Sequence, residues 1–520
     1  MPEFAIRVRS AGLGGFQIAT ILVAAFANAA SLAWPFDLLF SRGQPVWWMQ
    51  SLALAALAAI LQRSTGARQA TKVGLLFSTA WLSATFWWLY VAMHTYAGLH
   101  GLVATGAVIV LAAALGVYYT AAGVVYWQIF RSQSAWSGLS FAALWTMAEM
   151  ARGTWLTGFG WGAVAYAHVD GPLSGFAPWV GAYGVGAMAA GLSASIAMAV
   201  QGGSVQRAGA VGIVVLGLLL PLVAPQWSSS AGTLSVTLLQ GNIPQDEKFE
   251  SGSGVPLALQ WYGEQLKSGK GALVVAPETA IPLLPQELEP EYWEALKEHF
   301  SHQKQAGLVG FPWGSYSQGY TNAVLGFGPG QSEVWRYDKH HLVPFGEFIP
   351  PLFKWFTRMM NIPLGDFNRG ALGQASFAWS GQRLAPNICY EDLFGEELGA
   401  RFLDPTLAPT IFVNVSNIGW FGDSTAIDQH LQISRMRALE FERPFVRATN
   451  TGATVIMDHR AQITAALPRT TRGVLEGEVQ GRIGTTPYAW WVSRFGLWPL
   501  WLVALATVLV SCRKTLMERS

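Results

Sequence analysis

Long apolar segments toward both ends of the chain constrain its fold more than any other feature. Seven precede residue 226 and one follows residue 488, whereas the residues between them are rich in charge. A bilayer core about 30 Å thick needs roughly 20 apolar residues of α-helix to cross it. The pattern therefore predicts a multi-pass α-helical membrane domain interrupted by one polar domain. The candidate spans are Gly14–Trp34, Val46–Leu61, Val73–Ala92, Leu102–Phe130, Leu139–Met150, Ala177–Val200, Ala208–Ala224 and Phe495–Ser511.

Composition supports a membrane protein. Hydrophobic residues make up 52% of the chain, charged residues only 12%, and the mean hydropathy is +0.31. Soluble domains carry about 25% charged residues. The net charge of +2 is too small to indicate nucleic-acid binding.

Positive residues in the short loops predict the orientation. If the spans alternate, these residues fall on one side, which the positive-inside rule makes cytoplasmic. Both termini are then cytoplasmic and residues 226–488 lie outside, which in a bacterium is the periplasmic side of the inner membrane. The positive residues are Arg7, Arg9, Arg63, Arg68, Lys72, Arg131, Arg207, Arg513, Lys514 and Arg519.

One of the two cysteines stands where a nucleophile could be exposed. Cys389 ends an apolar, strand-like run from Arg383 to Ile388. A thiol at a strand end, before a turn toward a helix, can be met by backbone N–H groups. A buried core cysteine is the alternative. Because Cys512 lies at the cytoplasmic end of the last span, the two cannot pair, and a free thiol in an oxidising compartment indicates a function.

Two earlier segments supply partners for this thiol. Ala276–Ala280 ends an apolar strand with Glu278, and Lys339 and Glu347 stand in a later segment with a Pro-rich turn. The order Glu278, Lys339, Cys389 resembles the triad of the nitrilase (carbon–nitrogen hydrolase) superfamily.

The polar domain alternates short strands with helical segments, which indicates a layered α/β fold. The resemblance implies the four-layer αββα sandwich of the nitrilase superfamily. Helices are expected at Val255–Leu266, Pro290–Gln305 and Asp428–Glu442. Strands are expected at Leu234–Leu239, Leu273–Ala276, Gly307–Gly310, Ala323–Phe327, Leu384–Cys389, Thr410–Val415, Phe445–Thr449, Thr454–Met457 and Val474–Val479.

Six motifs extend the resemblance over nearly the whole chain. In their order and between predicted spans, they resemble the apolipoprotein N-acyltransferase family of the bacterial lipoprotein pathway. Two departures occur: Ile418-Gly419 stand where the family usually has Asp-Ala, and Phe249 stands near where relatives often carry Trp. The motifs are Thr157–Trp161, Asp170–Leu173, Gln240–Gln245, Leu342–Phe348, Ile388–Glu391 and Arg435–Glu440.

The resemblance implies a reaction and a role for each triad residue. Members of the family move a fatty acyl chain from a phospholipid to the α-amino group of a diacylglyceryl-modified N-terminal cysteine, the last step of lipoprotein maturation. Cys389 would form a thioester in a ping-pong reaction. Glu278 would accept and return protons, which favours a carboxyl pKa raised toward neutrality by burial. Lys339 would stabilise the oxyanion together with a backbone N–H near Tyr390.

Other residues would support this chemistry. Glu347 would hold Lys339 charged and oriented, unless it is a solvated turn carboxylate. Tyr390 and Glu391 match positions that shape the nucleophile turn, with structural packing as the alternative for Tyr390. Three aromatic residues could contact acyl chains, although core packing explains them equally well. They are Phe249, Trp420 and Phe421.

No cofactor or metal is expected. His340 and His341 flank Lys339, but no cluster of ligands at metal-binding spacing accompanies them, so local hydrogen bonding is the preferred interpretation. Within a predicted span, Glu149 and Arg152 lie three residues apart and are expected to neutralise each other.

The sequence thus predicts three parts: residues 1–225, an N-terminal transmembrane domain of about seven helices; 226–488, a periplasmic nitrilase-like catalytic domain; and 489–520, a C-terminal transmembrane helix with a cytoplasmic tail. The expected partners are a phosphatidylethanolamine-like acyl donor, a diacylated apolipoprotein acceptor and membrane lipids, without nucleic acid, and the chain is expected to be a monomer. A membrane-tethered amidase or nitrile hydrolase remains the alternative, because thioester formation is shared. Eight spans, where one tether would serve, argue against it.

Overall fold

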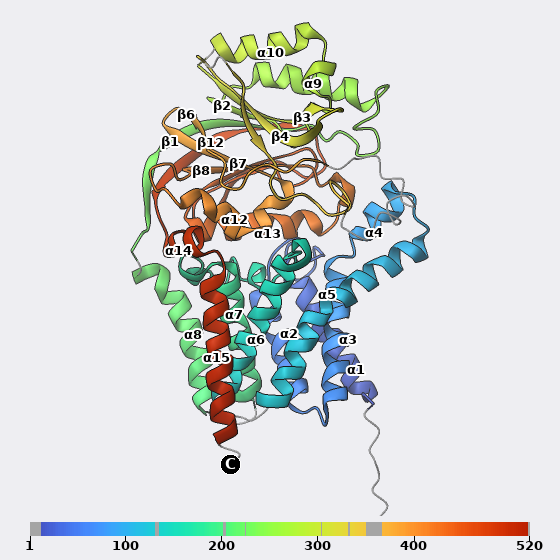
Figure 1. Ribbon diagram of the computed structural model, residues 1–520, viewed down its shortest axis with the longest axis vertical. Coiled ribbons are helices and arrows are strands. Elements are labelled where there is room, and N and C mark those ends of the chain that lie inside the picture. The colour runs from blue at the N-terminus through green and yellow to red at the C-terminus, as the bar shows by residue number, and fades with distance from the viewer. Residues whose placement is uncertain are drawn as a thin grey trace, which may run out of the picture.

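A bundle of helices stands beneath a layered α/β sandwich in the computed structural model (Figure 1). The structure describes residues 12–130, 135–200, 204–223, 225–302, 304–330, 333–349 and 367–517. Four of the loop and tail residues used to predict orientation lie outside these ranges. They are Arg7, Arg9, Arg131 and Arg519.

Helices form in all eight segments predicted as spans. The start of the first and the end of the last lie at the end of the bundle away from the sandwich (Figure 1). The main helices are α1 (Gly15–Ala30), α2 (Trp47–Gln62), α3 (Ala67–Thr85), α5 (Gly101–Phe130), α6 (Ala135–Thr154), α7 (Ala177–Ala199), α8 (Ser204–Val223) and α15 (Trp498–Met517). Short helical turns join them: α4 (Leu89–Val91), η1 (Ala92–Tyr96), η2 (Trp155–Thr157), η3 (Val164–His168) and η4 (Pro172–Phe176).

Length and hydropathy single out fewer of these helices. Among the described residues, Gly101–Ile129 and Pro172–Ala199 are each long and apolar enough to cross a membrane. Two pairs of helices pass the same test together although each pair is bent, and counting each pair as one span raises the number to four. One pair is Ala67–Thr85 with Leu89–Tyr96, bent by 63°. The candidate span Val73–Ala92 is therefore broken between Thr85 and Leu89. The second pair is Pro487–Phe495 with Trp498–Lys514, bent by 92°.

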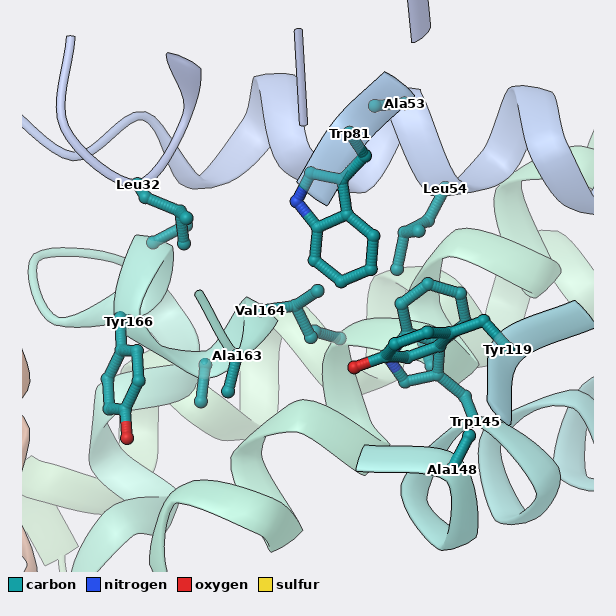
Figure 2. Packing of buried hydrophobic residues seen from close by; sticks show 14 of the residues in the cluster. Leu32, Ala53, Leu54, Trp81, Tyr119, Trp145, Ala148, Ala163, Val164 and Tyr166 are labelled. Carbon is teal, nitrogen blue, oxygen red and sulfur yellow. The ribbon is translucent and has the colours of Figure 1, made fainter. Parts of the chain in front are cut away.

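Aromatic rings from three helices fill the interior of the bundle. The ring of Trp81 lies 5.0 Å from that of Tyr119 and 5.7 Å from that of Trp145, measured between centroids. Figure 2 shows these rings together, with Val164 of η3 beside them. Such edge-to-face and offset contacts stabilise more than the buried area alone.

The expected ion pair between Glu149 and Arg152 does not form among the described residues. The guanidinium of Arg152 instead donates to the hydroxyl of Tyr119 at 2.8 Å and to the carbonyl of Trp161 at 2.7 Å. Glu149 accepts from the backbone N–H of Val164 at 3.0 Å. Arg152 thereby holds the loop after α6, which lies against the sandwich.

The sandwich contains two six-stranded sheets in the described residues, ordered β12-β1-β2-β3-β4-β5 and β11-β10-β9-β8-β7-β6. Their facing sides bury aliphatic residues such as Val275, Ile388 and Val413. The first sheet has β1 (Ser228–Gln240), β2 (Leu273–Val275), β3 (Ala306–Ser315), β4 (Gly319–Phe327), β5 (Trp335–Asp338) and β12 (Gly473–Gly484). The second has β6 (Phe377–Trp379), β7 (Gln382–Ile388), β8 (Ile411–Ser416), β9 (Phe445–Thr449), β10 (Val455–Met457) and β11 (Ile463–Ala466).

Helices cover both outer faces of the paired sheets, which confirms the predicted layered α/β fold. Helices α9 (Gly254–Ser268) and α10 (Pro290–His302) lie over the first sheet, on the side away from the bundle (Figure 1). Helices α12 (Gly395–Gly399) and α13 (Ala426–Phe441) lie between the second sheet and the bundle (Figure 1).

Helix α13 is polar in sequence yet buried at every residue except Leu439. Its side chains bind the bundle: Gln429 accepts hydrogen bonds from the indoles of Trp88 at 3.0 Å and Trp161 at 2.8 Å. Gln432 donates to the carbonyl of Gly43 at 3.0 Å. Buried polar groups need such partners, so α13 joins the two parts of the molecule.

Candidate active site

Three strand ends bring the predicted triad together. Glu278 follows β2, Lys339 follows β5, and Cys389 follows β7 of the opposite sheet. Strand β5 runs parallel to β2, because each of β3–β4 and β4–β5 is antiparallel while β2–β3 is parallel. Their carboxyl ends therefore lie at one edge of the sheet. The charges of Glu278 and Lys339 both act on the Cys389 thiol, which places all three in one site.

The carboxylate of Glu278 is fixed at both oxygens. Its Oε1 accepts from the side-chain amide of Asn322 at 2.7 Å and from Lys339 Nζ at 3.2 Å. Its Oε2 accepts from the backbone N–H of Asn417 at 2.9 Å. Only 8% of the residue is exposed. A carboxylate held in this way has little freedom to turn away from a neighbouring thiol.

Lys339 lies between two carboxylates. Besides Glu278, its Nζ donates to Glu347 Oε1 at 2.9 Å. The amide of Asn322 bridges the same two acids, since it also donates to Glu347 Oε1 at 2.8 Å. Burial disfavours the charged ammonium, but the charges of Glu278 and Glu347 outweigh this and raise the pKa of Lys339. Lys339 is thus a permanent cation.

Glu347 is not a solvated turn residue. Its second oxygen accepts from the backbone N–H of Val343 at 2.8 Å, and the residue is 7% exposed. The carboxylate therefore orients Lys339 from inside the protein.

Cys389 occupies a sharp turn at the end of β7. Its φ of +52° lies in the left-handed region, which non-glycine residues rarely adopt. The side chain is half-buried and forms no disulfide. Burial, reinforced by the charge of Glu278, raises the pKa of the Cys389 thiol well above its ordinary value. The predicted nucleophile is therefore a neutral thiol, which would need a base to react.

The electrostatics of Glu278 differ from the sequence prediction. Burial alone would raise the pKa of this carboxyl, as expected, but the ammonium groups of Lys339 and Lys248 outweigh burial and lower it. The prediction of a raised pKa was wrong because the sequence showed one lysine at the site, not two. Glu278 is ionised at neutral pH and ready to accept a proton.

Glu391 ties the Cys389 turn to the segment that carries Lys339. Its Oε1 accepts from the backbone N–H groups of His340 at 2.7 Å and His341 at 3.2 Å. The hydroxyl of Tyr337 donates to both of its oxygens, at 2.9 and 2.8 Å. Burial raises the pKa of Glu391 above its usual range.

Tyr390 is a packing residue that reaches the bundle. It is 5% exposed, and its hydroxyl donates to the carbonyl of Gly158 at 3.0 Å. Its ring lies 5.2 Å from that of Phe394 and 5.6 Å from that of His341. The nucleophile turn thus rests on the loop after α6.

The three candidate aromatic residues lie on two loops that meet beside Glu278. Gln245, in the loop of Phe249, accepts from the side-chain amide of Asn417 at 2.7 Å, and Asn417 precedes Trp420 and Phe421. Phe249 is 44% exposed. Trp420 and Phe421 are partly buried against rings of the bundle, namely Tyr96 at 5.7 Å and Trp88 at 4.3 Å.

Ile418, which stands where the family usually has aspartate, packs into the apolar cluster beneath α13 and is 1% exposed. No carboxylate is available at this position. Glu278 receives its contact from this loop through the backbone of Asn417 instead.

His340 and His341 make local hydrogen bonds, as the sequence indicated. His340 Nδ1 contacts the carbonyl of Gly370 at 2.8 Å, and His341 contacts Glu397 at 2.9 Å and the carbonyl of Thr157 at 3.0 Å. Burial lowers the pKa of His341 to about 4. Within the described residues, no group of three or more His, Cys, Asp or Glu side chains is arranged to hold a metal ion.

Two residues of the site were not singled out from the sequence. Asn322 lies in β4, where a buried amide inside an apolar strand was the only signal. Lys248 precedes Phe249 in a loop, and a loop lysine normally indicates solvent exposure. Its Nζ nevertheless lies 3.0 Å from the carbonyl of Glu278.

Two family models match the chain. Residues 16–195 match the family described as the apolipoprotein N-acyltransferase N-terminal domain, and residues 235–488 match carbon-nitrogen hydrolase. A carbon-nitrogen hydrolase from Helicobacter pylori G27 aligns at 18% identity over 52% of this chain and 94% of its own, with a TM-score of 0.34.

Relatives over nearly the full length share one description. Apolipoprotein N-acyltransferase of Verminephrobacter eiseniae (strain EF01-2) is 54% identical over 93% of this chain and 94% of its own. That of Ralstonia nicotianae (strain ATCC BAA-1114 / GMI1000) is 44% identical over 85% of each chain. The chain therefore belongs to the apolipoprotein N-acyltransferase family.

Proposed function

We propose that this protein transfers a fatty acyl chain from a membrane phospholipid to the α-amino group of the diacylglyceryl-cysteine at the N-terminus of apolipoproteins. The observation that carries the proposal is the half-buried thiol of Cys389 beside the buried Glu278–Lys339–Glu347 network. Relatives named apolipoprotein N-acyltransferase, together with the matching N-terminal domain, make the tethered amidase or nitrilase the less favoured interpretation.

In the first half of the reaction, Cys389 would attack the phospholipid ester. Glu278 accepts the thiol proton as the bond from Sγ to the carbonyl carbon forms. Lys339, with a backbone N–H near Tyr390, stabilises the resulting oxyanion, and one such donor contributes about 3 kcal/mol to a transition state. The intermediate collapses, the C–O bond breaks, and the lyso-phospholipid leaves with the proton from Glu278.

In the second half, the lipoprotein amine would attack the thioester carbonyl. Glu278 accepts a proton from the attacking nitrogen, the C–S bond breaks, and the proton returns to the Cys389 sulfur. The two lipids enter in turn, so the kinetics are ping-pong. Supporting roles fall to Glu347, which orients Lys339, and to Tyr390 and Glu391, which hold the nucleophile turn.

Aromatic side chains beside the site suit lipid substrates. We assign acyl-chain contacts to Phe249, Trp420 and Phe421, on the two loops that meet at Glu278. Apolar walls would also disfavour water, which at about 55 M otherwise consumes a thioester.

The proposed setting is the bacterial inner membrane. Residues 1–225 and 489–520 would form the membrane part and residues 226–488 the periplasmic catalytic domain, with both termini cytoplasmic. The apolar helices beneath the sandwich support this arrangement (Figure 1). The donor would be phosphatidylethanolamine-like, the acceptor a diacylated apolipoprotein, and the working unit a monomer without a cofactor.

The test separates transfer from hydrolysis. Purified protein is loaded with a fluorescent phosphatidylethanolamine, and the acyl group on Cys389 is located by mass spectrometry. The loaded enzyme should persist in buffer and discharge when a diacylated lipopeptide with a free α-amine is added. An N-acetylated lipopeptide, which lacks the nucleophile, is the matched control and should leave the thioester intact. Rapid loss of the acyl group as free fatty acid would contradict the proposal and establish a hydrolase.

A further inference from the structure

A second lysine lies in the site, and the triad does not include it. Lys248 is 1% exposed although it stands in a loop. Its Nζ donates to the backbone carbonyl of Glu278 at 3.0 Å and to the hydroxyl of Thr279 at 2.7 Å. A buried ammonium is costly, so one kept without a salt bridge in the described part of the chain needs a reason.

The first contribution of Lys248 is to geometry. Thr279 follows Glu278 with a φ of +46°, a left-handed conformation that is unfavourable for a β-branched residue. Lys248 binds the backbone before this residue and the side chain of the residue itself, and so spans the turn. The same ammonium lies 5.6 Å from the ring centroid of the half-exposed Phe249. One side chain thus anchors the turn of the base and the start of a substrate-facing loop.

The second contribution is to charge. With a neutral thiol, the carboxylates of Glu278 and Glu347 are balanced by Lys339 and Lys248. When the thiol proton moves to Glu278, the thiolate of Cys389 replaces one carboxylate and the balance holds. Without Lys248, the same groups carry one excess negative charge, which disfavours a thiolate. Both Glu278 and Cys389 act electrostatically on Lys248.

We propose that Lys248 is a positioning residue of the acylation step, which holds the turn of Glu278 and balances the charge of the Cys389 thiolate. The inference rests on the proposed acyl transfer and adds to it a residue that neither half of the mechanism above uses. Burial lowers the pKa of Lys248 to about 8, so its charge is present at neutral pH.

The test compares Lys248→Met, which keeps the unbranched side chain one atom shorter and removes the charge, with Lys248→Arg, which keeps the charge. We measure the single-turnover rate of thioester formation and the pH at which iodoacetamide half-maximally alkylates Cys389. Lys248→Met should slow acylation about 100-fold and raise the alkylation midpoint by about one pH unit or more. Lys248→Arg should keep the wild-type midpoint and lose about tenfold in rate because the fork of its guanidinium fits the turn less well.

Two controls isolate the effect. Lys267→Met, at an exposed position of α9, should match the wild type in both measurements. Thr279→Val removes one hydrogen bond of Lys248 but not its charge, so it should slow acylation less than tenfold and leave the midpoint unchanged. A purely structural role of Lys248 would lower the yield or the melting temperature without moving the midpoint, and that result would overturn the proposal.

If Lys248→Met does not fold, the pH dependence of acylation by the wild-type protein tests the proposal. Acylation should fall as the pH rises through about 8, where Lys248 loses its proton. Glu278 is already ionised there, Lys339 stays charged, and ionisation of Cys389 would change the rate in the opposite direction. A flat or rising rate contradicts the inference. Failure of the wild type to form any thioester would contradict the proposed function instead.

Discussion

Glu391 accepts a 2.7 Å hydrogen bond at Oε2 from the backbone N–H of Ile388, three residues earlier. The same carboxylate binds the backbone N–H of His340 at its other oxygen. The turn that carries Cys389 and the segment of Lys339 therefore share one buried carboxyl group. This single side chain therefore links the two halves of the site, which come from different sheets.

Replacing Glu391 with glutamine should loosen that link. A glutamine amide has one acceptor oxygen and would direct an NH₂ group toward backbone donors, so at least one buried N–H loses its partner. We expect a loss of roughly 2–3 kcal/mol in the free energy of unfolding and a slower rate of thioester formation. Thermal unfolding in detergent and single-turnover acylation measure the two effects. Glu298→Gln, at an exposed position of α10, should change neither, and an equally stable Glu391→Gln would contradict the role.

Removing the thiol should abolish the reaction. Cys389→Ala should form no acyl-enzyme and lose more than about 1,000-fold in transfer, while folding normally. Cys389→Ser should be nearly as inactive, because a hydroxyl is far less acidic than the thiol that Glu278 is matched to. Fluorescent phospholipid labelling on a gel, with circular dichroism as the folding control, tests both. Normal transfer by the alanine variant would refute the mechanism.

The pH dependence of acylation should extend into the acid range. Glu278 must be ionised to accept the thiol proton, and its pKa lies below the ordinary 4.5 because Lys339 and Lys248 outweigh burial. The ionised Glu278 carboxylate contributes to the free energy of unfolding above the pKa that Glu278 has in the unfolded chain. This contribution is lost as the pH falls through the lower pKa of Glu278 in the folded protein. Asn322→Ala, which removes a donor to Glu278, should move the acid limb of the rate to higher pH. An unmoved limb would show that Glu278 is not the titrating base.

Phe249 should matter for substrate and not for stability. It is 44% exposed, so Phe249→Ala should change the free energy of unfolding by less than about 0.5 kcal/mol. Loss of an acyl contact worth about 1.5 kcal/mol would raise the KM for phospholipid roughly tenfold. The matched control is Tyr316→Ala, which removes a ring that is 76% exposed and outside the proposed site. Equal KM values for the two variants would remove Phe249 from the acyl-chain site.

The orientation can be tested with the two free cysteines. A membrane-impermeant thiol reagent added outside spheroplasts should label Cys389, slowly if loops cover it, and leave Cys512 unlabelled. Permeabilised cells should label both. Labelling of Cys389 only after permeabilisation of the inner membrane would invert the proposed topology.

Apolar patterns in the sequence predicted most strands of the sandwich. They did not predict the mostly exposed edge strands or the polar first half of β1. The nine expected strands all form, whereas β5, β6 and β11 were missed because each lies at a sheet edge and has at most one buried residue, so it lacks an apolar run. Strand β1 begins at Ser228, six residues before the expected start, because its polar first half gains its order from pairing with β12. A pairing partner more than 200 residues away cannot be predicted from the residues near Ser228.

The site shows the same division. Glu278 and Cys389 could be predicted because each ends an apolar strand, and Lys339 was added from the resemblance to the nitrilase triad. The lowered pKa of Glu278 was not, since it depends on Lys248, thirty residues earlier, whose burial is a tertiary property. The hydrogen bonds of Arg152 could not be predicted for a related reason: their acceptors, at Tyr119 and Trp161, come from outside the helix.

Helix α13 would lose its buried polar partners if the sandwich were separated from the bundle. Cutting the chain at the ends of the sandwich would strip Gln429 and Gln432 of their bundle partners and separate Arg435 from Asp170. Separating the sandwich from the bundle would also expose to water the face of α13 on which Gln429 binds the indoles of Trp88 and Trp161. Engineering a detergent-free version therefore requires rewriting the bundle-facing side chains of α13, and not only choosing where to sever the chain.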